Sequence, residues 1–421
     1  MRTRHALLYP LSLSLLALGA GAGSAQAAGF QLLEQNASGL GNAYAGSAAI
    51  AENASTIYYN PAGMSYLDGL SVSAGLNAIK PSFKFRDNGR SAAPLAAPAS
   101  LAGAHNGGDV GSWGMVPNAY LAWRVNERWS LGVGLGAPFG LMTDYDGGWM
   151  GEFHSNKFEI VTININPSVA YRVNERWSVG AGLNYQRIDA EYTRRAVVAP
   201  GVTSKALVDM DGDAWGWNAG VMFQPTEATR LGLSYRSKIK HSAKGHTTVD
   251  GVAKVDARAD VDLPDTVVLS AFHRLDSRWE LLADVSWTGW SSIPELDIRN
   301  GAPLPGDTLK LDFRDTWRIA LGANYRLSPA WKLKFGLAWD QSPVHKASDR
   351  PTSLPDNDRW WFSTGVQFQP SANTAIDLGY TYLYLDDTRI DNAHDPVGKG
   401  RIAGEYRSRG HIVGVQVSSR F

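Results

Sequence analysis

The sequence Arg124-Val125-Asn126-Glu127-Arg128-Trp129 returns unchanged as Arg172-Val173-Asn174-Glu175-Arg176-Trp177. Looser copies and two related stretches complete a set of six, beginning at Arg274, Arg326, Gln224 and Gln369. Each stretch lies between segments in which apolar and polar residues alternate. Alternation predicts strands, and a short polar stretch between two strands predicts a tight hairpin turn.

The segments that join these hairpins are longer and irregular. There are seven of them, at residues 87–115, 138–157, 193–212, 242–262, 292–312, 342–358 and 388–404. Seven long loops alternating with six short turns predict a meander of 14 strands with both chain ends on the short-turn side. Even strand number and this asymmetry of loops are typical of outer-membrane barrels. We therefore expect an all-β fold, a 14-stranded antiparallel transmembrane β-barrel, over residues 70–421.

Residue parity supports a barrel that faces lipid. In residues 161–166, 279–287 and 313–321 the odd positions are mostly apolar and the even ones mostly polar or small, so odd residues should face lipid and even residues the lumen. Three aromatic pairs are spaced eight residues apart, namely Trp177 and Tyr185, Trp279 and Trp287, and Trp331 and Trp339. That spacing is roughly 20 Å of height in a tilted strand, close to the distance between two aromatic girdles. The alternative, a soluble core, does not explain a fixed spacing from a turn.

The first 27 residues have the pattern of a secretory signal peptide. Arg2 and Arg4 precede an apolar run from Leu7 to Leu18, and Ala25-Gln26-Ala27 supplies the small residues of a cleavage site. The mature chain is therefore expected to leave the cytoplasm. Its last strand ends in Phe421, which resembles the C-terminal signal that outer-membrane barrels present to their insertion machinery.

Composition excludes several classes of protein. The chain has no Cys, which excludes disulfides and zinc-thiolate sites, and its 40 basic and 40 acidic residues do not suit nucleic-acid binding. Neither a His-Glu-x-x-His nor a Gly-x-Ser-x-Gly motif occurs, so we expect no enzyme activity. We also expect no cofactor and no metal site.

Residues 28–64 are expected to be enclosed by another part of the protein. They are rich in Gly, Ala, Ser and Asn, have neither a helical nor a strand period, and are too apolar for a solvated linker. We expect residues 28–69 to form an N-terminal hatch that fills the barrel.

Seven short motifs occur in a fixed order along the mature chain. They are Ala28-Gly29-Phe30-Gln31-Leu32, Ser38-Gly39-Leu40-Gly41-x-Ala43, Asn60-Pro61-Ala62, Pro138-Phe139-Gly140-Leu141, Trp317-Arg318-Ile319-Ala320-Leu321-Gly322, Ser342-Pro343-Val344 and Pro355-Asp356-x-Asp358-Arg359-x-Trp361. With these motifs the chain resembles the FadL-type long-chain fatty-acid transport family of Gram-negative outer membranes. The outer-loop sequences and the pair Glu52-Asn53 depart from the family pattern.

The resemblance implies how such a protein works. A hydrophobic ligand adsorbs between outer loops, moves to a pocket in the lumen, and leaves sideways through a kink in the third strand into the bilayer. Long-chain fatty acids are the expected substrate, and aromatic or aliphatic hydrocarbons are the alternative by the same route. More distant alternatives are a general diffusion porin and an outer-membrane lipase. We expect a monomer.

Three groups of residues are candidates for this function. The third strand carries Gly132, Gly134, Gly136, Pro138, Phe139 and Gly140, where Pro cannot donate to the ladder and Gly relaxes the backbone. An ordinary strand end is the alternative. The resemblance places Phe30 against the ligand tail, and Arg194 and Arg314 against its carboxylate. Their alternatives are hatch packing and local ion pairs with Glu191 or Asp315.

Overall fold

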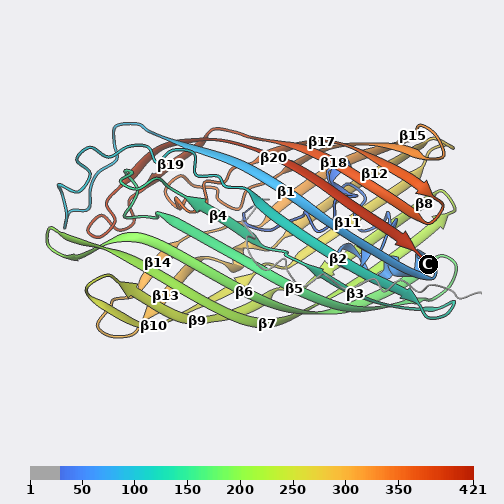
Figure 1. Cartoon of the computed structure of the whole chain (residues 1–421), viewed down its shortest axis with the longest axis horizontal. Helices are drawn as coiled ribbons and strands as arrows, with labels where there is room; N and C mark the ends of the chain where they lie inside the picture. The colour runs from blue at the N-terminus through green and yellow to red at the C-terminus, as the bar shows by residue number, and fades with distance from the viewer. Residues whose placement is uncertain (1–28) are drawn as a thin grey trace, which may run out of the picture.

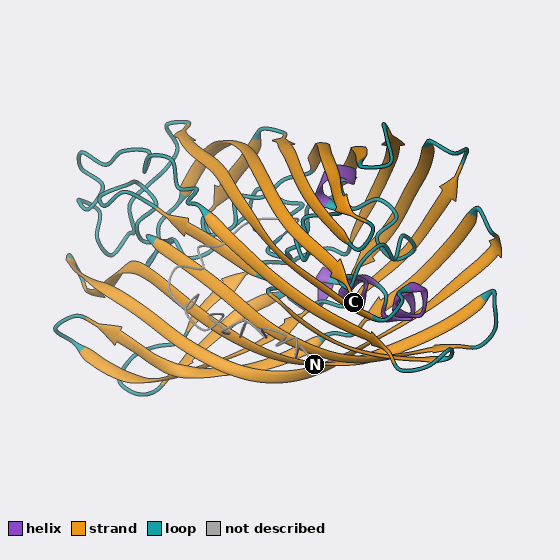
Figure 2. Ribbon diagram, turned by 45° about the vertical axis from the view of Figure 1, so that its right-hand side comes forward, coloured by secondary structure: helices purple, strands orange, loops and turns teal. Residues whose placement is uncertain are grey.

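The computed structural model describes residues 29–421, so the expected signal peptide at residues 1–27 lies outside the described residues. It is a closed antiparallel barrel of 14 strands, as the turns predict, and helices are few (Figures 1 and 2). Eight barrel strands are continuous: β1 (Leu70–Asp87), β2 (Gly114–Arg124), β5 (Lys157–Arg172), β6 (Trp177–Ala199), β7 (Val202–Thr226), β16 (Trp331–Asp340), β17 (Arg359–Ser371) and β20 (Ile402–Arg420).

The other six barrel strands are each interrupted and consist of two labelled segments. They are β3 (Trp129–Gly136) with β4 (Gly140–Asp144), β8 (Thr229–Arg236) with β9 (Ile239–Val249), β10 (Ala253–Leu263) with β11 (Thr266–Arg274), β12 (Trp279–Thr288) with β13 (Glu295–Asn300), β14 (Asp307–Lys310) with β15 (Thr316–Arg326), and β18 (Thr374–Leu385) with β19 (Thr388–Asn392). The barrel closes where β20 pairs with β1, from Ser71 opposite Arg420 to Asp87 opposite Gly404.

The repeated turn sequence has a direct physical role. The side chain of Asn126 accepts hydrogen bonds from the backbone N–H groups of Arg128 and Trp129, both at 2.9 Å. Asn174 repeats this arrangement in the second copy at the same distances. A short polar side chain that bonds the backbone two and three residues later stabilises a tight turn, which explains why the stretch recurs.

Three of the seven connections expected to be irregular are instead paired strands. β6 and β7 pair as far as Ala199 and Val202, β9 and β10 as far as Val249 and Ala253, and β13 pairs with β14. The expectation of irregular loops was therefore wrong for residues 193–212, 242–262 and 292–312. These hairpins carry charged residues on their outer face, because beyond the membrane that face meets water, and the lipid-type alternation is lost.

The alternation of lipid-facing odd residues and lumen-facing even residues holds within the membrane, but it fails at one position where it was predicted. On β15, Trp317 and Leu321 are 51% and 60% exposed, whereas Arg318 is 6% exposed and faces the lumen. Phe313 was expected to face lipid, but it is 5% exposed inside the barrel. Residues 311–315 lie outside any strand and Asp312 has a positive φ of 43°, so the alternation of β15 does not extend back to them.

The N-terminal segment, residues 29–69, lies inside the barrel near the short-turn end (Figure 2). It contains η1 (Leu40–Asn42), α1 (Thr56–Tyr59) and η2 (Pro61–Tyr66), and one further short helix, η3 (Trp290–Ser292), interrupts a barrel strand. The Asn60 side chain accepts a hydrogen bond from Ala62 N–H and donates to Val221 O at 3.1 Å on the wall. None of the helices within residues 29–421 has the length and apolarity that crossing a membrane requires.

Glycines let this segment approach the wall closely. A Cβ added to Gly336 on β16 would lie 2.1 Å from the backbone carbon of Asn42, and one on Gly180 of β6 would lie 2.4 Å from the nitrogen of Ala62. Neither distance is compatible with a side chain. The inward glycines of the barrel therefore provide the space that η1 and η2 occupy.

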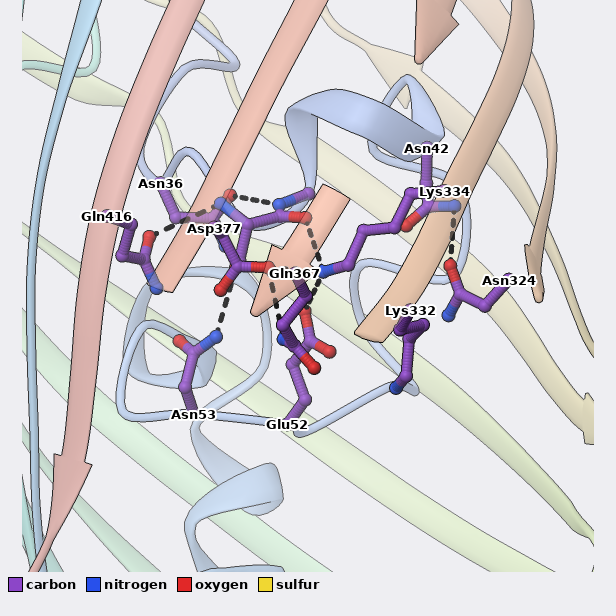
Figure 3. A network of polar contacts seen from close by, with 12 residues as sticks. Asn36, Asn42, Glu52, Asn53, Asn324, Lys332, Lys334, Gln367, Asp377 and Gln416 are labelled. Carbon is purple, nitrogen blue, oxygen red and sulfur yellow. Dashed lines mark hydrogen bonds and ion pairs between the residues drawn. The ribbon is translucent and has the colours of Figure 1, made fainter. Parts of the chain in front are cut away.

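A buried lysine fixes the N-terminal segment electrostatically (Figure 3). Lys334 of β16 contacts Glu52 of the segment and Asp377 of β18, each at 2.9 Å, and donates to the carbonyl oxygen of Ser38 at 2.8 Å. Its side chain is 2% exposed. A buried charge is tolerated because carboxylates surround it, and removing one partner of such a group is strongly destabilising.

The substitution Lys334→Met tests this attachment. It leaves two carboxylates in the lumen without their cation, so we expect a loss of about 3–5 kcal/mol of stability and a rise in ion conductance in planar bilayers as the segment loosens. Lys332→Met is the control, because Lys332 forms one ion pair with Glu280 at 3.3 Å and is 17% exposed. Equal thermal midpoints and equal conductance for the two variants would contradict the role of Lys334.

Candidate functional site

The third barrel strand is interrupted at residues 137–139, between β3 and β4. Pro138 has no N–H to donate, and the backbone here leaves the regular ladder. On one side Phe139 still bonds to β5, because its N–H donates to the Thr162 hydroxyl at 2.9 Å and its carbonyl accepts from Thr162 N–H at 3.1 Å. The strand-3 break is therefore held to β5 by one threonine.

On the other side the break separates the strand from β2. β2 pairs with β3 through residues 119–124, whereas Gly114 to Asn118 pair with β1 alone. Within residues 29–421 no ladder joins this part of β2 to residues 137–142. The wall thus has an edge that strand pairing does not close.

The N-terminal segment takes over the backbone bonds of the break. Leu32 N–H donates to Pro138 O at 2.7 Å, and Gly140 N–H donates to Phe30 O at 2.9 Å. The Gln35 side chain bonds both backbone groups of Ala137, at 2.7 and 3.1 Å. Residues 30–35 therefore form the backbone hydrogen bonds that a neighbouring strand would otherwise supply at the break.

An apolar cluster lines the lumen beside the break. We call it the lumen cluster, and its buried members are Phe30, Phe139, Leu141, Ile160, Ile188, Leu263, Trp290, Ile293, Leu311, Phe313, Val344 and Leu354. Trp290 is its centre, with ring centroids 5.0 Å from Phe30 and 6.0 Å from Phe313. Because Phe139 and Leu141 also flank the break, the cluster reaches the interrupted part of the wall.

One buried carboxylate holds the start of the described chain in place, and with it Phe30. Gly29 N–H donates to Asp356 Oδ2 at 2.9 Å, and the Ser342 hydroxyl donates to the same oxygen at 2.7 Å. Arg359 forms an ion pair with Asp356. Burial raises the pKa of Asp356 above its usual value, against the effect of Arg359.

At its end nearest the outer loops, the lumen cluster is followed by a group of charged side chains. Arg194 of β6 and Lys399 contact the two oxygens of Asp307, at 2.8 and 2.6 Å. Beside them is a cavity of about 230 Å³, lined by Leu309, Lys399 and His154 among others. Leu309 packs against the lumen cluster, so the apolar lining is continuous with this cavity.

Burial sets the charge state of the loop residues around this cavity. It lowers the pKa of His154 to about 3, so this side chain is neutral at neutral pH. It also lowers the pKa of Lys399, although the neighbouring Asp307 acts in the opposite direction. Lys310 and Asp395 line the cavity as well, and Asp395 adds a second carboxylate to that of Asp307.

Arg194 and Arg314 are not brought together. Arg194 lies on the inner face of β6, as its even parity predicts, and no register shift occurs between Gln186 and Arg194. Arg314 follows β14 outside any strand, donates to Ser342 O at 3.1 Å and contacts Asp358 at 3.3 Å. Among the residues that the structure describes, no contact joins the two arginines.

The glycines of β3 lie beneath the break and not in it. Gly132, Gly134 and Gly136 belong to the regular ladder with β5. A Cβ on Gly132 would lie 2.6 Å from Ile57, and one on Gly136 would lie 2.3 Å from Gln35. These glycines make room for the N-terminal segment, whereas Pro138, Phe139 and Gly140 occupy the break itself.

The comparisons with known proteins agree with this architecture. Residues 18–421 match the family described as outer membrane protein transport protein (OMPP1/FadL/TodX). The chain belongs to this family. It is an outer-membrane β-barrel of the Gram-negative type, and members of the family are transport channels.

Two relatives and one structure show how far the likeness extends. Outer membrane protein P1 of Haemophilus influenzae is 34% identical over 401 residues, covering 86% of this chain and 87% of the relative. The long-chain fatty acid transport protein of Salmonella typhi is 30% identical over 404 residues, covering 87% and 90%. The crystal structure of a Pseudomonas aeruginosa FadL homologue has a TM-score of 0.86 at 24% identity, covering 94% of this chain and 100% of that chain, and supports the fold.

The sequence did not indicate four residues that lie around the lumen cluster. Trp290, Asp307, Asp356 and Lys399 were not predicted to take part. Asp356 had a signal, since it belongs to the motif Pro355-Asp356-x-Asp358-Arg359, but nothing in that motif indicates its distant partner Gly29. The ion pairs of Asp307 join residues 92 and 113 positions apart, and no local pattern indicates them.

Gly29→Ala tests how tightly the start of the chain fits the lumen cluster. The new Cβ would lie 2.7 Å from the Trp290 ring, and Gly29 has a positive φ of 64°. We expect a loss of about 2–4 kcal/mol, from backbone strain of about 1 kcal/mol together with overpacking of about 1–3 kcal/mol. The thermal midpoint of the purified barrel measures it.

Gly201→Ala is the matched control. Gly201 has a φ of 73°, and nothing lies within 4 Å of the position that its Cβ would take, so it carries the same strain without the contact. If both variants shift the midpoint equally, the tight fit against Trp290 is refuted.

Proposed function

We propose that the chain takes up hydrophobic compounds across the outer membrane, with long-chain fatty acids as the first choice, and acts as a monomer without enzymatic chemistry. One observation carries this proposal. The lumen cluster has cations at its outer end and the strand-3 break at its inner end, so a molecule with an anionic head and an apolar tail has a place for each part.

In this proposal residues 28–69 are the hatch, and Asn60, Pro61 and Ala62 help to hold it to the wall. The ligand passes from the lumen cluster through the strand-3 break into the bilayer, at Pro138, Phe139 and Gly140. Gly132, Gly134 and Gly136 contribute indirectly by seating the hatch. Transfer of apolar surface from water to lipid releases about 25 cal/mol per Å², so the route needs no energy source.

The charges at the cavity favour an acid over a neutral ligand. Arg194, Lys310 and Lys399 are opposed by the carboxylates of Asp307 and Asp395, and His154 is neutral. Two of these cations, Arg194 and Lys399, lie at the end of an apolar cluster. A guanidinium or ammonium group binds a carboxylate strongly where water is scarce. We assign Arg194 to this role and Phe30 to contact with the tail, whereas Arg314 acts through Asp358 on the loop that holds Phe30.

Uptake of neutral hydrocarbons is the second candidate, and a specific observation favours it. Asp307 already accepts both Arg194 and Lys399, so neither cation needs a carboxylate from a ligand. In that case the charged group is structural and the lumen cluster alone selects the cargo.

The double variant Arg194→Gln with Lys399→Gln separates the two candidates. If the cations meet a carboxylate, we expect binding of a long-chain acid to weaken by about 10- to 100-fold, since a hydrogen bond to a charged group contributes about 1.5–3 kcal/mol. Binding of the hydrocarbon of equal chain length should not change. Fluorescence displacement on the purified barrel measures both.

Arg187→Gln is the control for that variant. Arg187 lies on the same strand but on the outer face, where it contacts Asp189 and Asp211 at 3.2 and 3.0 Å. An equal loss for acid and hydrocarbon in the double variant would leave hydrocarbon uptake as the better explanation.

A disulfide tests the lateral route. Gln31 and Phe139 are directly opposite each other in an isolated antiparallel bridge, and the flanking bonds make them a non-hydrogen-bonded pair, whose Cα atoms are about 4.5 Å apart. That distance suits a disulfide, and the chain has no other Cys. In the variant Gln31→Cys with Phe139→Cys we expect the oxidised protein to lose uptake, because the hatch cannot leave the break.

The reduced form of the same variant is its control, since it shares every substitution. Reduction should restore uptake into cells or vesicles. Equal uptake in the oxidised and reduced forms would show that cargo does not pass between the N-terminal segment and the break.

A further inference from the structure

A group of cations lies on the outer wall, where the last strand meets the first. We call it the seam patch, and its members are Lys80, Lys84 and Arg86 of β1 with Arg407 and Arg409 of β20. The two strands are hydrogen-bonded neighbours, with Lys84 opposite Arg407 and Arg86 opposite Glu405. The patch is therefore one contiguous surface.

The seam patch begins where the lipid-facing belt ends. On β20 the outward residues Val417, Val415 and Val413 are 46%, 46% and 44% exposed, and the same face continues with His411 and then Arg409. Arg409 is about 30 Å above the end of β20 at 3.3 Å per residue and a tilt of about 40°, and the apolar band of such barrels is about 25 Å tall. The cations thus stand at the level of lipid headgroups.

Tyrosines beside the patch mark the same level. Tyr384 of β18 is opposite Arg409, and the hydroxyl of Tyr380 lies 2.8 Å from His411 Nδ1. Both tyrosines face outward, at 47% and 39% exposure. Tyrosine and tryptophan concentrate at membrane interfaces, where one end of the ring is apolar and the other meets water.

Most of the seam patch has no partner in the protein. Within residues 29–421, Arg86, Arg407 and Arg409 form neither an ion pair nor a side-chain hydrogen bond. Lys84 contacts Asp109 at 3.8 Å, and Lys80 donates to the Gly111 carbonyl at 2.6 Å. With Arg389, which is opposite Glu405, this surface has six cations, and its carboxylates are Asp109, Glu405 and the exposed Asp386 and Asp387 between β18 and β19. The patch therefore carries an excess of positive charge.

Several outward cations elsewhere on the barrel contact carboxylates, although within residues 29–421 Lys244 of β9 and the opposite Arg258 of β10 form no ion pair. Arg187 contacts Asp189 and Asp211, Lys240 contacts Asp262 at 3.9 Å, and Arg299 contacts Asp260. The seam between β1 and β20 thus differs from the surface around Arg187, Lys240 and Arg299, because several of its cations have no carboxylate in contact, and charge complementarity predicts an anion there.

We propose that the seam patch binds the phosphorylated headgroup of an outer-leaflet lipid. The acyl chains lie against the apolar face formed by Leu76 and the three valines of β20, and the phosphates meet the arginines. Arginine suits phosphate because its planar fork donates two parallel hydrogen bonds. This site is on the outside of the wall and does not depend on the proposed uptake of hydrophobic compounds.

Native mass spectrometry of the delipidated barrel tests the site, with bisphosphorylated lipid A as the probe. The patch variant carries Arg86→Gln, Arg407→Gln and Arg409→Gln. We expect its affinity for this lipid to fall by more than about tenfold, because each basic residue near an anionic headgroup contributes measurably to binding. The control variant carries Arg187→Gln, Lys240→Gln and Arg299→Gln, and its affinity should change by less than about twofold. Equal losses in the two variants would overturn the proposal.

A second measurement uses the unaltered protein and so does not depend on how the variants fold. It should bind bisphosphorylated lipid A more tightly than the same lipid without phosphates, and salt at about 1 M should remove the difference, since the Debye length falls from about 10 Å at 0.1 M to about 3 Å. Equal binding of the two lipids at low salt would refute the site. Uptake assays on the patch variant are a separate readout, so failure of this proposal and failure of the proposed function remain distinguishable.

Discussion

A strand that borders lipid can leave its ladder only where other groups take over its backbone donors and acceptors, because the bilayer core offers none. The strand-3 break satisfies this constraint with Thr162 on one side and residues 30–35 on the other. The N-terminal segment is therefore more than a filling of the lumen. It completes the hydrogen bonding of the wall at the place where the strands do not.

The same constraint links the two ends of the N-terminal segment. Residues 29–32 are fixed by Asp356 and by the break, whereas Glu52 is fixed by Lys334 near the short-turn end. Release at the break requires the loss of a few hydrogen bonds, each of which costs about 1–3 kcal/mol where a buried donor or acceptor is left without a partner. Release at Lys334 requires the separation of a buried cation from two carboxylates at once, and breaking one such pair alone costs about 3–5 kcal/mol. A change at the start of the chain is thus compatible with a segment that stays attached lower in the barrel.

The features of the fold and of the site that could be predicted from the sequence are those that depend on residues close together in the chain. Turns were predictable, because the side chain of Asn126 acts on the backbone two and three residues later. Strand number and parity were predictable within the membrane, where lipid imposes alternation. The hairpin of β6 and β7 was not, because both of its faces meet polar surroundings above the membrane. Phe313 was misplaced because a positive φ at Asp312 interrupts the strand, and a sequence does not display that. The cation group around Asp307 depends on loops that meet only in the folded barrel.

The pairing of β20 with β1 has a consequence for assembly. Leu70 N–H donates to Phe421 O and Phe421 N–H donates to Leu70 O, so the last residue of the chain bonds to the first residue of the sheet. Contacts between such distant positions form slowly. Until they form, the sheet has two unpaired edge strands, and these can pair with other chains. Assembly of this cylinder therefore ends when β20 forms its ladder with β1, from Ser71 opposite Arg420 to Asp87 opposite Gly404, and a polypeptide without β20 would leave β1 and β18 each with an unpaired edge.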